Sequence, residues 1–205
     1  MKSMLNIESQ NFARRFTHLL DLLSSPKFLA MEGLGNEIPF FICPFPIKQA
    51  KQMSKDIEDL KVQLRNKGID VLDVNLYRLS LKILEERDIL DSIIQNEHTI
   101  DKAQLCELLQ NVLDSENHLV PQIEEEVQDS QHKILFITGI GEVFPYIRLH
   151  TVLNNMQKIS HNKPTVFFFP GEYNAANENG STLSLFGVMD DKYYRAFNIF
   201  DCLPK

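Results

Sequence analysis

The chain is 205 residues long, with 43% hydrophobic residues, 24% charged residues and a formal net charge of −7. This length provides for a large hydrophobic core, and this composition excludes an intrinsically disordered chain. The acidic balance argues against binding of nucleic acid or of an anionic membrane by the molecule as a whole.

The cellular setting is predicted from the cysteines and from the apolar runs. Cys43, Cys106 and Cys202 are odd in number and far apart, so they predict no disulfide framework and favour a reducing compartment. The first residues lack the apolar core of a signal peptide. No apolar run approaches the roughly 20 residues that span a bilayer. We therefore expect a cytoplasmic protein that does not associate with a membrane.

The first part of the chain predicts a helix, a short second helix and a buried strand. Apolar residues repeat at steps of three and four over residues 9–23, which indicates an amphipathic helix. Pro26 follows and can open the short second helix. Residues 39–43 form an unbroken apolar run, which is typical of a strand buried on both faces.

The next segment predicts the clearest helix of the chain and a second strand. Ala50, Met53, Ile57, Leu60 and Leu64 repeat at three, four, three and four, with Gly68 at the place of a left-handed helix cap. Residues 71–76 then read as a strand. A strand, a helix and a strand without a hairpin signal predict a right-handed parallel crossover.

A helical insertion is predicted between the second and third strands, over about residues 79–130. Its parts are a helix over 79–97, a second helix capped by Thr99 or Asp101, and a third over 120–127. The apolar stripe of the second helix consists of Leu105, Leu108, Leu109, Val112 and Leu113. Because no linker composition separates these helices from the rest, we expect one domain over residues 1–205.

A second crossover follows, and it organises the fold. Residues 133–138 predict a buried strand, Gly139 and Gly141 a turn, Pro145 the start of a helix, and residues 165–169 a further buried strand. The tail, over 184–189 and 193–200, predicts strands that complete the sheet, with turns at residues 179–180 and 190–191. The expected class is α/β: a mostly parallel sheet in three layers, with a helical insertion.

The alternation of strands and helices suggests nucleotide binding, but the chain lacks residues that the P-loop and the dinucleotide-binding motif require. The segment from Cys43 to Lys48 contains two prolines and no glycine, so it cannot wrap a phosphate with backbone amides as a P-loop does. The third strand ends at Thr138, without a carboxylate to hold magnesium. The dinucleotide fingerprint Gly-x-Gly-x-x-Gly has Phe144 in place of its third glycine. We expect no cofactor.

Several polar residues remain as candidates, each with a structural alternative. Gly139 and Gly141 lie before a helix N-terminus and could bind an anion, although a tight turn with positive φ explains them more simply. Arg148, His150 and Asn154 could face a cleft or a partner, or form a solvated helix face. Glu172, after the fourth strand, stands where α/β enzymes carry catalytic carboxylates, but the pattern supplies no accompanying acid, base or nucleophile.

Metal and nucleic-acid binding receive little support from the sequence. The six histidines are scattered, and no Cys-x-x-Cys occurs, so no metal site is expected. The basic residues of the 48–67 helix could contact phosphate backbones, although interleaved acidic residues favour a solvated face. The residues that would carry this alternative are Lys48, Lys51, Lys55 and Arg65.

Six short segments are distinctive in combination: residues 33–41, 136–145, 147–155, 169–173, 183–187 and 193–197. Together they resemble the BrxB family, a small component of the bacterial BREX phage-defence systems, and the resemblance extends over essentially the whole chain.

The resemblance implies a role in an assembly that distinguishes phage from host DNA and blocks phage replication. Its other members include the alkaline-phosphatase-like PglZ, the large ATPase BrxC and the methyltransferase PglX. It also implies a sheet like that of a P-loop hydrolase without the phosphate loop, and no catalytic residues. The family has been associated with RNA binding, which the acidic balance does not support.

We therefore expect a non-catalytic adaptor that contacts the PglZ-like protein and possibly the BrxC-like ATPase. RNA binding and degenerate nucleotide binding are the alternatives. The expected contact surface lies at the carboxyl edge of the sheet, where α/β folds place their sites. Its residues are Gly139, Gly141, Glu142, Pro145, Arg148, His150, Asn154, Gly171, Glu172 and Tyr173.

Overall fold

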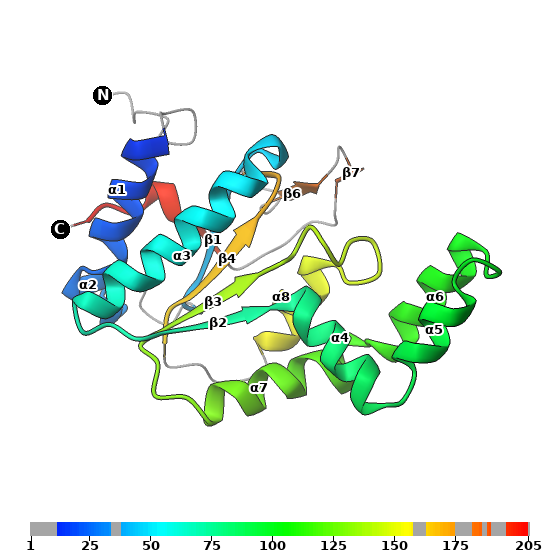
Figure 1. The fold of residues 1–205 in the computed structure, drawn as a ribbon. Coiled ribbons are helices and arrows are strands. Elements are labelled where there is room, and N and C mark those ends of the chain that lie inside the picture. The colour runs from blue at the N-terminus through cyan, green and yellow to red at the C-terminus, as the bar shows by residue number, and fades with distance from the viewer. Residues whose placement is uncertain are drawn as a thin grey trace. The chain divides into compact units, whose positions relative to one another are not determined.

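The structure is a computed structural model that describes residues 12–33, 38–157, 163–174, 182–185, 188–189 and 196–204. Its main element is a five-stranded parallel sheet with strand order β2-β3-β4-β1-β8 (Figure 1), so the predicted α/β class is confirmed. The strands are β1 (Phe40–Pro44), β2 (Val71–Asn75), β3 (Ile134–Thr138), β4 (Thr165–Phe169) and β8 (Phe197–Asn198).

Helices connect these strands. The first crossover is η2 (Ile47–Gln49) with α3 (Ala50–Asn66), and α8 (Leu149–Met156) lies between β3 and β4. The remaining helices are α1 (Phe12–Leu23), α2 (Pro26–Leu29), α4 (Leu76–Glu86), α5 (Leu90–Asn96), α6 (Lys102–Val112), the π-helical η3 (Ser115–Leu119), α7 (Val120–Gln128) and η4 (Ile199–Asp201). Among the described residues, no helix is long and apolar enough to cross a membrane.

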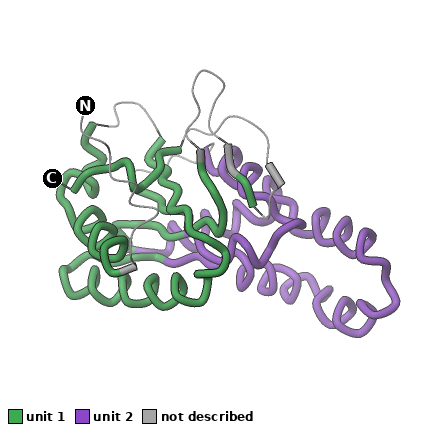
Figure 2. Tube along the Cα trace, turned by 90° about the horizontal axis from the view of Figure 1, so that it is seen from above, with its two compact units in different colours: residues 1–72, 131–136, 161–205 green, residues 73–130, 137–160 purple. Residues whose placement is uncertain are grey.

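The chain divides into two compact units, which Figure 2 shows in green and purple. Unit 1 comprises residues 1–72, 131–136 and 161–205, and unit 2 comprises residues 73–130 and 137–160. The division passes through β2 and β3, so each unit holds part of the sheet. One domain over residues 1–205 stays a prediction.

In unit 1, α1 and α3 pack against one face of the sheet in a single apolar cluster. The α3 side chains of this cluster are the predicted ones: Met53, Ile57, Leu60 and Leu64 are all buried. Phe136 on β3 contacts Phe168 on β4 edge to face, at 4.9 Å between ring centroids. Residues on both faces of β1, β3 and β4 are buried, as their unbroken apolar runs predict.

Gly68 confirms the predicted helix cap. Its φ is +72°, and the amide of Ile69 donates to Leu64 O at 3.0 Å, which closes the last turn of α3.

In unit 2, the predicted single helix over 79–97 is wrong, because the chain breaks between α4 and α5. Asp88 has φ +58°, its amide donates to Glu85 O, and the amide of Ile89 donates to Leu84 O, which together form a left-handed helix cap. Aspartate tolerates this conformation through its short polar side chain. Such a cap usually contains glycine, so the sequence carries no break signal here.

Two further predictions are corrected. Pro145 does not open a helix: it lies in a turn in which the amide of Ile147 donates to Val143 O at 2.9 Å, and α8 begins only at Leu149. The predicted strand over 184–189 does not extend the main sheet. It forms β6 (Thr182–Leu185) and β7 (Val188–Met189), which pair antiparallel with β5 (Glu172–Asn174) in a separate sheet.

The last strand, β8, joins the main sheet as predicted, and the structure places it beside β1. The turns expected at residues 179–180 and 190–191 lie outside the described residues.

Candidate functional site

The turn after β3 is held by a close contact between Gly139 and Asn75. Gly139 has φ +71°, which confirms the predicted turn conformation. A Cβ at this position would come within 2.7 Å of Asn75 Oδ1. Asn75 is itself fixed, because its side chain accepts the amide of Arg78 at 3.0 Å and caps α4. The ends of β2 and β3 therefore meet at a position where only glycine fits without a rearrangement.

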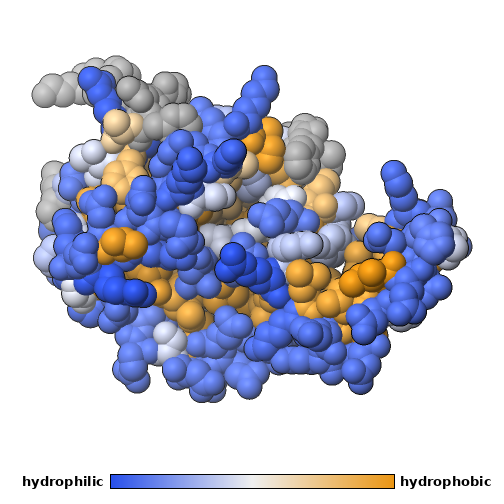
Figure 3. All heavy atoms as spheres, viewed as in Figure 1, coloured by the Kyte–Doolittle hydropathy of each residue, from blue (hydrophilic) through white to orange (hydrophobic). Residues whose placement is uncertain are grey.

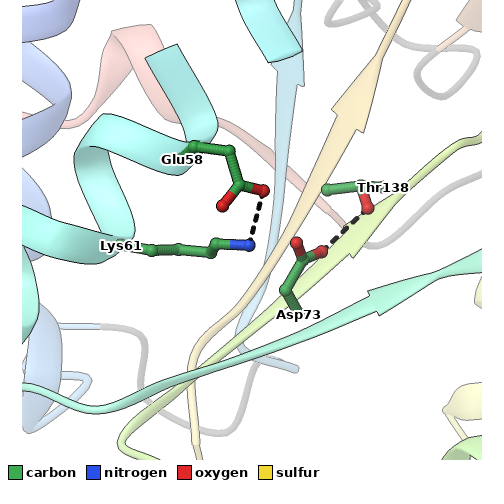
Figure 4. A network of polar contacts seen from close by, with 4 residues as sticks. All are labelled: Glu58, Lys61, Asp73 and Thr138. Atoms are coloured by element: carbon green, nitrogen blue, oxygen red, sulfur yellow. Dashed lines mark hydrogen bonds and ion pairs between the residues drawn. The ribbon is translucent and has the colours of Figure 1, made fainter. Parts of the chain in front are cut away.

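A polar pair that the sequence analysis missed joins the same two strands. Thr138 Oγ1 donates to Asp73 Oδ1 at 2.8 Å (Figure 4), and the threonine is buried. A carboxylate of the neighbouring strand β2 is thus hydrogen-bonded to the last residue of β3. The sequence alone could not predict this contact, because Asp73 and Thr138 are 65 residues apart and meet only through the strand order.

The loop from residue 140 to residue 148 has a buried base and an exposed rim. Ile140, Val143 and Ile147 are almost fully buried. The rim contains three predicted site residues with exposed side chains, namely Glu142, Pro145 and Arg148, while Gly141 is half-buried. The turn is closed by the amide of Glu142, which donates to Gly139 O at 3.1 Å. This arrangement presents charged groups from a firmly packed loop.

Helix α8 continues this surface. It buries its four apolar residues, Leu149, Val152, Leu153 and Met156. The predicted His150 is half-buried and Asn154 is exposed. Seven of the ten predicted site residues thus lie in one continuous segment of unit 2, between residues 139 and 154.

Tyr146 in this loop has a perturbed ionisation. Burial, and then the neighbouring Tyr77 and Glu142, raise the pKa of Tyr146 from 10.0 to about 12. The folded protein therefore holds this phenol proton more tightly than the unfolded chain does. Its contribution to stability is complete below pH 10 and is lost as the pH rises from 10 through 12.

We expect Tyr146→Phe to leave the tyrosinate absorbance of the protein almost unchanged between pH 10 and pH 11, because this phenol stays protonated in that range. The measurement is an ultraviolet pH titration of the variant beside the wild type. If the variant lost a full tyrosine equivalent of absorbance in that range, the assigned burial of Tyr146 would be contradicted.

The remaining three predicted residues lie in unit 1: Gly171 precedes β5, and Glu172 and Tyr173 are its first two residues. A Cβ on Gly171 would run into the Ser184 carbonyl oxygen and the Phe169 ring, so this glycine permits the close passage of two backbones. Glu172 is exposed. Tyr173 is buried, and its hydroxyl donates to Ala196 O at 2.6 Å, so this side chain contributes to packing.

The residues of the nucleic-acid alternative are exposed along η2 and α3. Lys48, Lys51, Lys55 and Arg65 all have exposed side chains. Acidic groups of the same helix are close by: Lys61 Nζ lies 2.7 Å from Glu58 Oε1, the second pair drawn in Figure 4. This pair offsets the positive charge of one further lysine of α3.

The segment after β1 uses its backbone for packing. The amide of Phe45 donates to Phe169 O at 2.9 Å, and the amide of Gln49 donates to Pro46 O at 2.8 Å. Pro44 and Pro46 have no amide hydrogen. Within the described part of the chain, no three His, Cys, Asp or Glu side chains gather as a metal site would require.

Comparison with known proteins agrees with the predicted resemblance. The family described as "BREX protein BrxB" matches residues 72–199. The chain is 37% identical over 192 residues to a BREX protein BrxB of Bacillus cereus (strain H3081.97), covering 91% of this chain and 96% of the relative. It is 26% identical over 187 residues to a BREX protein BrxB of Escherichia coli O9:H4 (strain HS), covering 90% of each.

No solved structure matches the chain. The family match covers more than half of the sequence, and the relatives align over nearly its full length. The chain therefore belongs to the BrxB family of BREX proteins.

Proposed function

We propose that this BREX protein acts in phage defence as a non-catalytic adaptor that contacts other proteins of the system, the PglZ-like protein first among them. The observation that carries the proposal is the nearly full-length similarity to a BREX protein BrxB. An adaptor needs a rigid surface that presents charged side chains, and the loop after β3 has this form. Glu142 and Arg148 extend from a base of buried Ile140, Val143 and Ile147.

The local chemistry of the sheet edge supports an interaction role over nucleotide hydrolysis. After β1, Pro44 and Pro46 have no amide hydrogen, and the amide of Phe45 is bonded to Phe169 O, so few donors remain there to cradle a phosphate. Asp73 is engaged by Thr138. We expect calorimetry with ATP or GTP and magnesium to give no heat of binding, and a saturable heat would favour the degenerate nucleotide-binding alternative.

The main test is a purification of the tagged protein from cells that express the whole defence gene set, read by quantitative mass spectrometry. We expect the PglZ-like protein to be recovered in near-equal amount with the wild type. We expect at least a tenfold loss with Glu142→Lys plus Arg148→Glu, because like charges then face each other across the contact.

Lys51→Glu plus Lys55→Glu is the matched control, since it reverses two exposed charges elsewhere on the chain. It should leave recovery unchanged. Recovery that depends on these two lysines and disappears after nuclease treatment would instead favour nucleic-acid binding. Recovery of the tagged chain alone would contradict the adaptor function.

A further inference from the structure

Helices α5 and α6 leave much of their apolar surface uncovered. Helix α5 buries Ile93 but leaves Ile94 59% exposed, and α6 buries Val112 but leaves Leu108 37% exposed. Leu105 and Leu109 of α6 are only half-buried. In contrast, α3 buries four side chains of its apolar stripe. We name the four residues with exposed or half-buried side chains, Ile94, Leu105, Leu108 and Leu109, the α5–α6 surface.

The sequence predicts an apolar stripe on α6, and the structure buries only the C-terminal end of that stripe. Val112 and Leu113 are buried, and Arg87 Nη1 donates to Val112 O at 3.0 Å, which anchors that end of the helix. The earlier turns of α6 remain accessible to solvent. Figure 3 shows apolar side chains gathered over the α4 and α5–α6 region of unit 2.

The segment that carries these apolar residues is predominantly acidic, and we call its carboxylates the acidic rim. Residues 85–112 contain seven carboxylates and two cationic side chains, a net charge of −5 out of −7 for the whole chain. One of the two cations, Arg87, is already bonded to α6. The carboxylates are Glu85, Glu86, Asp88, Asp91, Glu97, Asp101 and Glu107. All seven are exposed.

This acidic rim selects among possible occupants. It repels nucleic acid and anionic lipid, and two such surfaces repel each other in a symmetric dimer. The basic helix of a second copy, α3, does not supply a matching face either, because its apolar stripe is buried in its own core. A protein segment with apolar side chains between lysines or arginines can cover the apolar residues and pair its cations with the carboxylates of the acidic rim.

We propose that the α5–α6 surface binds an amphipathic helix of a protein partner, with apolar residues spaced three and four apart and basic residues along both edges. Leu105, Leu108 and Leu109 form the ridge that such a helix packs against, since residues three and four apart lie on one face. The proposal extends the proposed function, because it names a second surface and the chemistry of the partner segment that it receives.

The direct test uses a fluorescent synthetic peptide of about five helical turns, with leucines at the stated spacing and lysines on both flanks. We expect saturable binding to the full chain, and at least a tenfold weaker affinity for Ile94→Gln plus Leu108→Gln. Val62→Gln is the matched control, because Val62 on α3 is also an exposed aliphatic residue, at 57%. A peptide twin with glutamates in place of lysines should not bind.

Cys106 on α6 gives a local readout of the same binding. It is half-buried, whereas Cys43 is buried, and burial together with Asp201 raises the pKa of Cys202 to about 11. Iodoacetamide near neutral pH should therefore modify Cys106 first, and the bound peptide should slow that reaction several-fold. Equal peptide affinity of wild type and the double variant, or unchanged Cys106 alkylation, would overturn the proposal.

Purification from cells that express the defence genes separates this proposal from the proposed function. Loss of a co-purifying subunit with Ile94→Gln plus Leu108→Gln, but not with Val62→Gln, supports both. Recovery unchanged by the double variant overturns the α5–α6 surface and leaves the adaptor function standing. Wild-type protein that recovers no subunit but still binds the peptide overturns the adaptor function alone. Self-association that the double variant abolishes would overturn the stated partner chemistry.

Discussion

Gly139→Ala is expected to lower the free energy of unfolding by about 3 kcal/mol. A side chain at φ +71° costs about 1 kcal/mol in backbone conformation. The added Cβ also collides with the Asn75 side chain, which must leave its position as the cap of α4. Loss of such a cap costs about another 1 kcal/mol, and the remaining overlap adds to it. Urea unfolding followed by circular dichroism measures the difference.

Two controls separate the contributions. Gly68→Ala has nearly the same φ, +72°, with open space around it, so it should cost only about 1 kcal/mol. Asn75→Ala removes the cap and also the group that collides with the methyl group introduced by Gly139→Ala. The double variant should therefore be more stable than the sum of the single effects indicates. Additive effects would show that Gly139 and Asn75 do not touch.

Arg15→Ala is expected to lower the free energy of unfolding by about 3 kcal/mol. Arg15 is 3% exposed, its Nη2 donates to Pro44 O at 2.9 Å, and its guanidinium lies 5.0 Å from the centre of the Phe200 ring. A hydrogen bond to a charged group contributes about 1.5–3 kcal/mol, and a desolvated cation–π contact about 1–2 kcal/mol more. The side chain thus joins α1 to the end of β1.

Arg14→Ala is the matched control for this variant. Arg14 is the neighbouring arginine on α1 and is exposed, so its removal should change stability by less than about 0.5 kcal/mol. Thermal and urea unfolding of both variants check the difference. Equal stabilities of the two variants would contradict the described packing of Arg15.

The strands of the core could be predicted because burial on both faces leaves a plain signal. The apolar runs at β1, β3 and β4 appear as predicted, and the stripe of α3 ends at Gly68 as expected. The break at Asp88 could not be predicted, since an aspartate there replaces the glycine that usually marks such a cap.

Only those residues of the candidate site that are close together in the sequence could be predicted. The seven predicted residues between 139 and 154 lie in one loop and the helix that follows it. Asp73 and Asn75 were missed, because their contacts with Thr138 and Gly139 depend on strand order. The stripe of α6 shows a second limit. Periodicity identifies an apolar face but does not say what covers it, and here much of that face stays uncovered.

The adaptor function is tested most directly by size-exclusion chromatography with light-scattering detection. The sample is a mixture of two purified proteins, this chain of 23.7 kDa and the PglZ-like protein of the same defence system. We predict one species at micromolar concentration whose mass equals the sum of the two, and its disappearance when Glu142 and Arg148 are reversed in charge. Separate elution of the two wild-type proteins at their individual masses would contradict it.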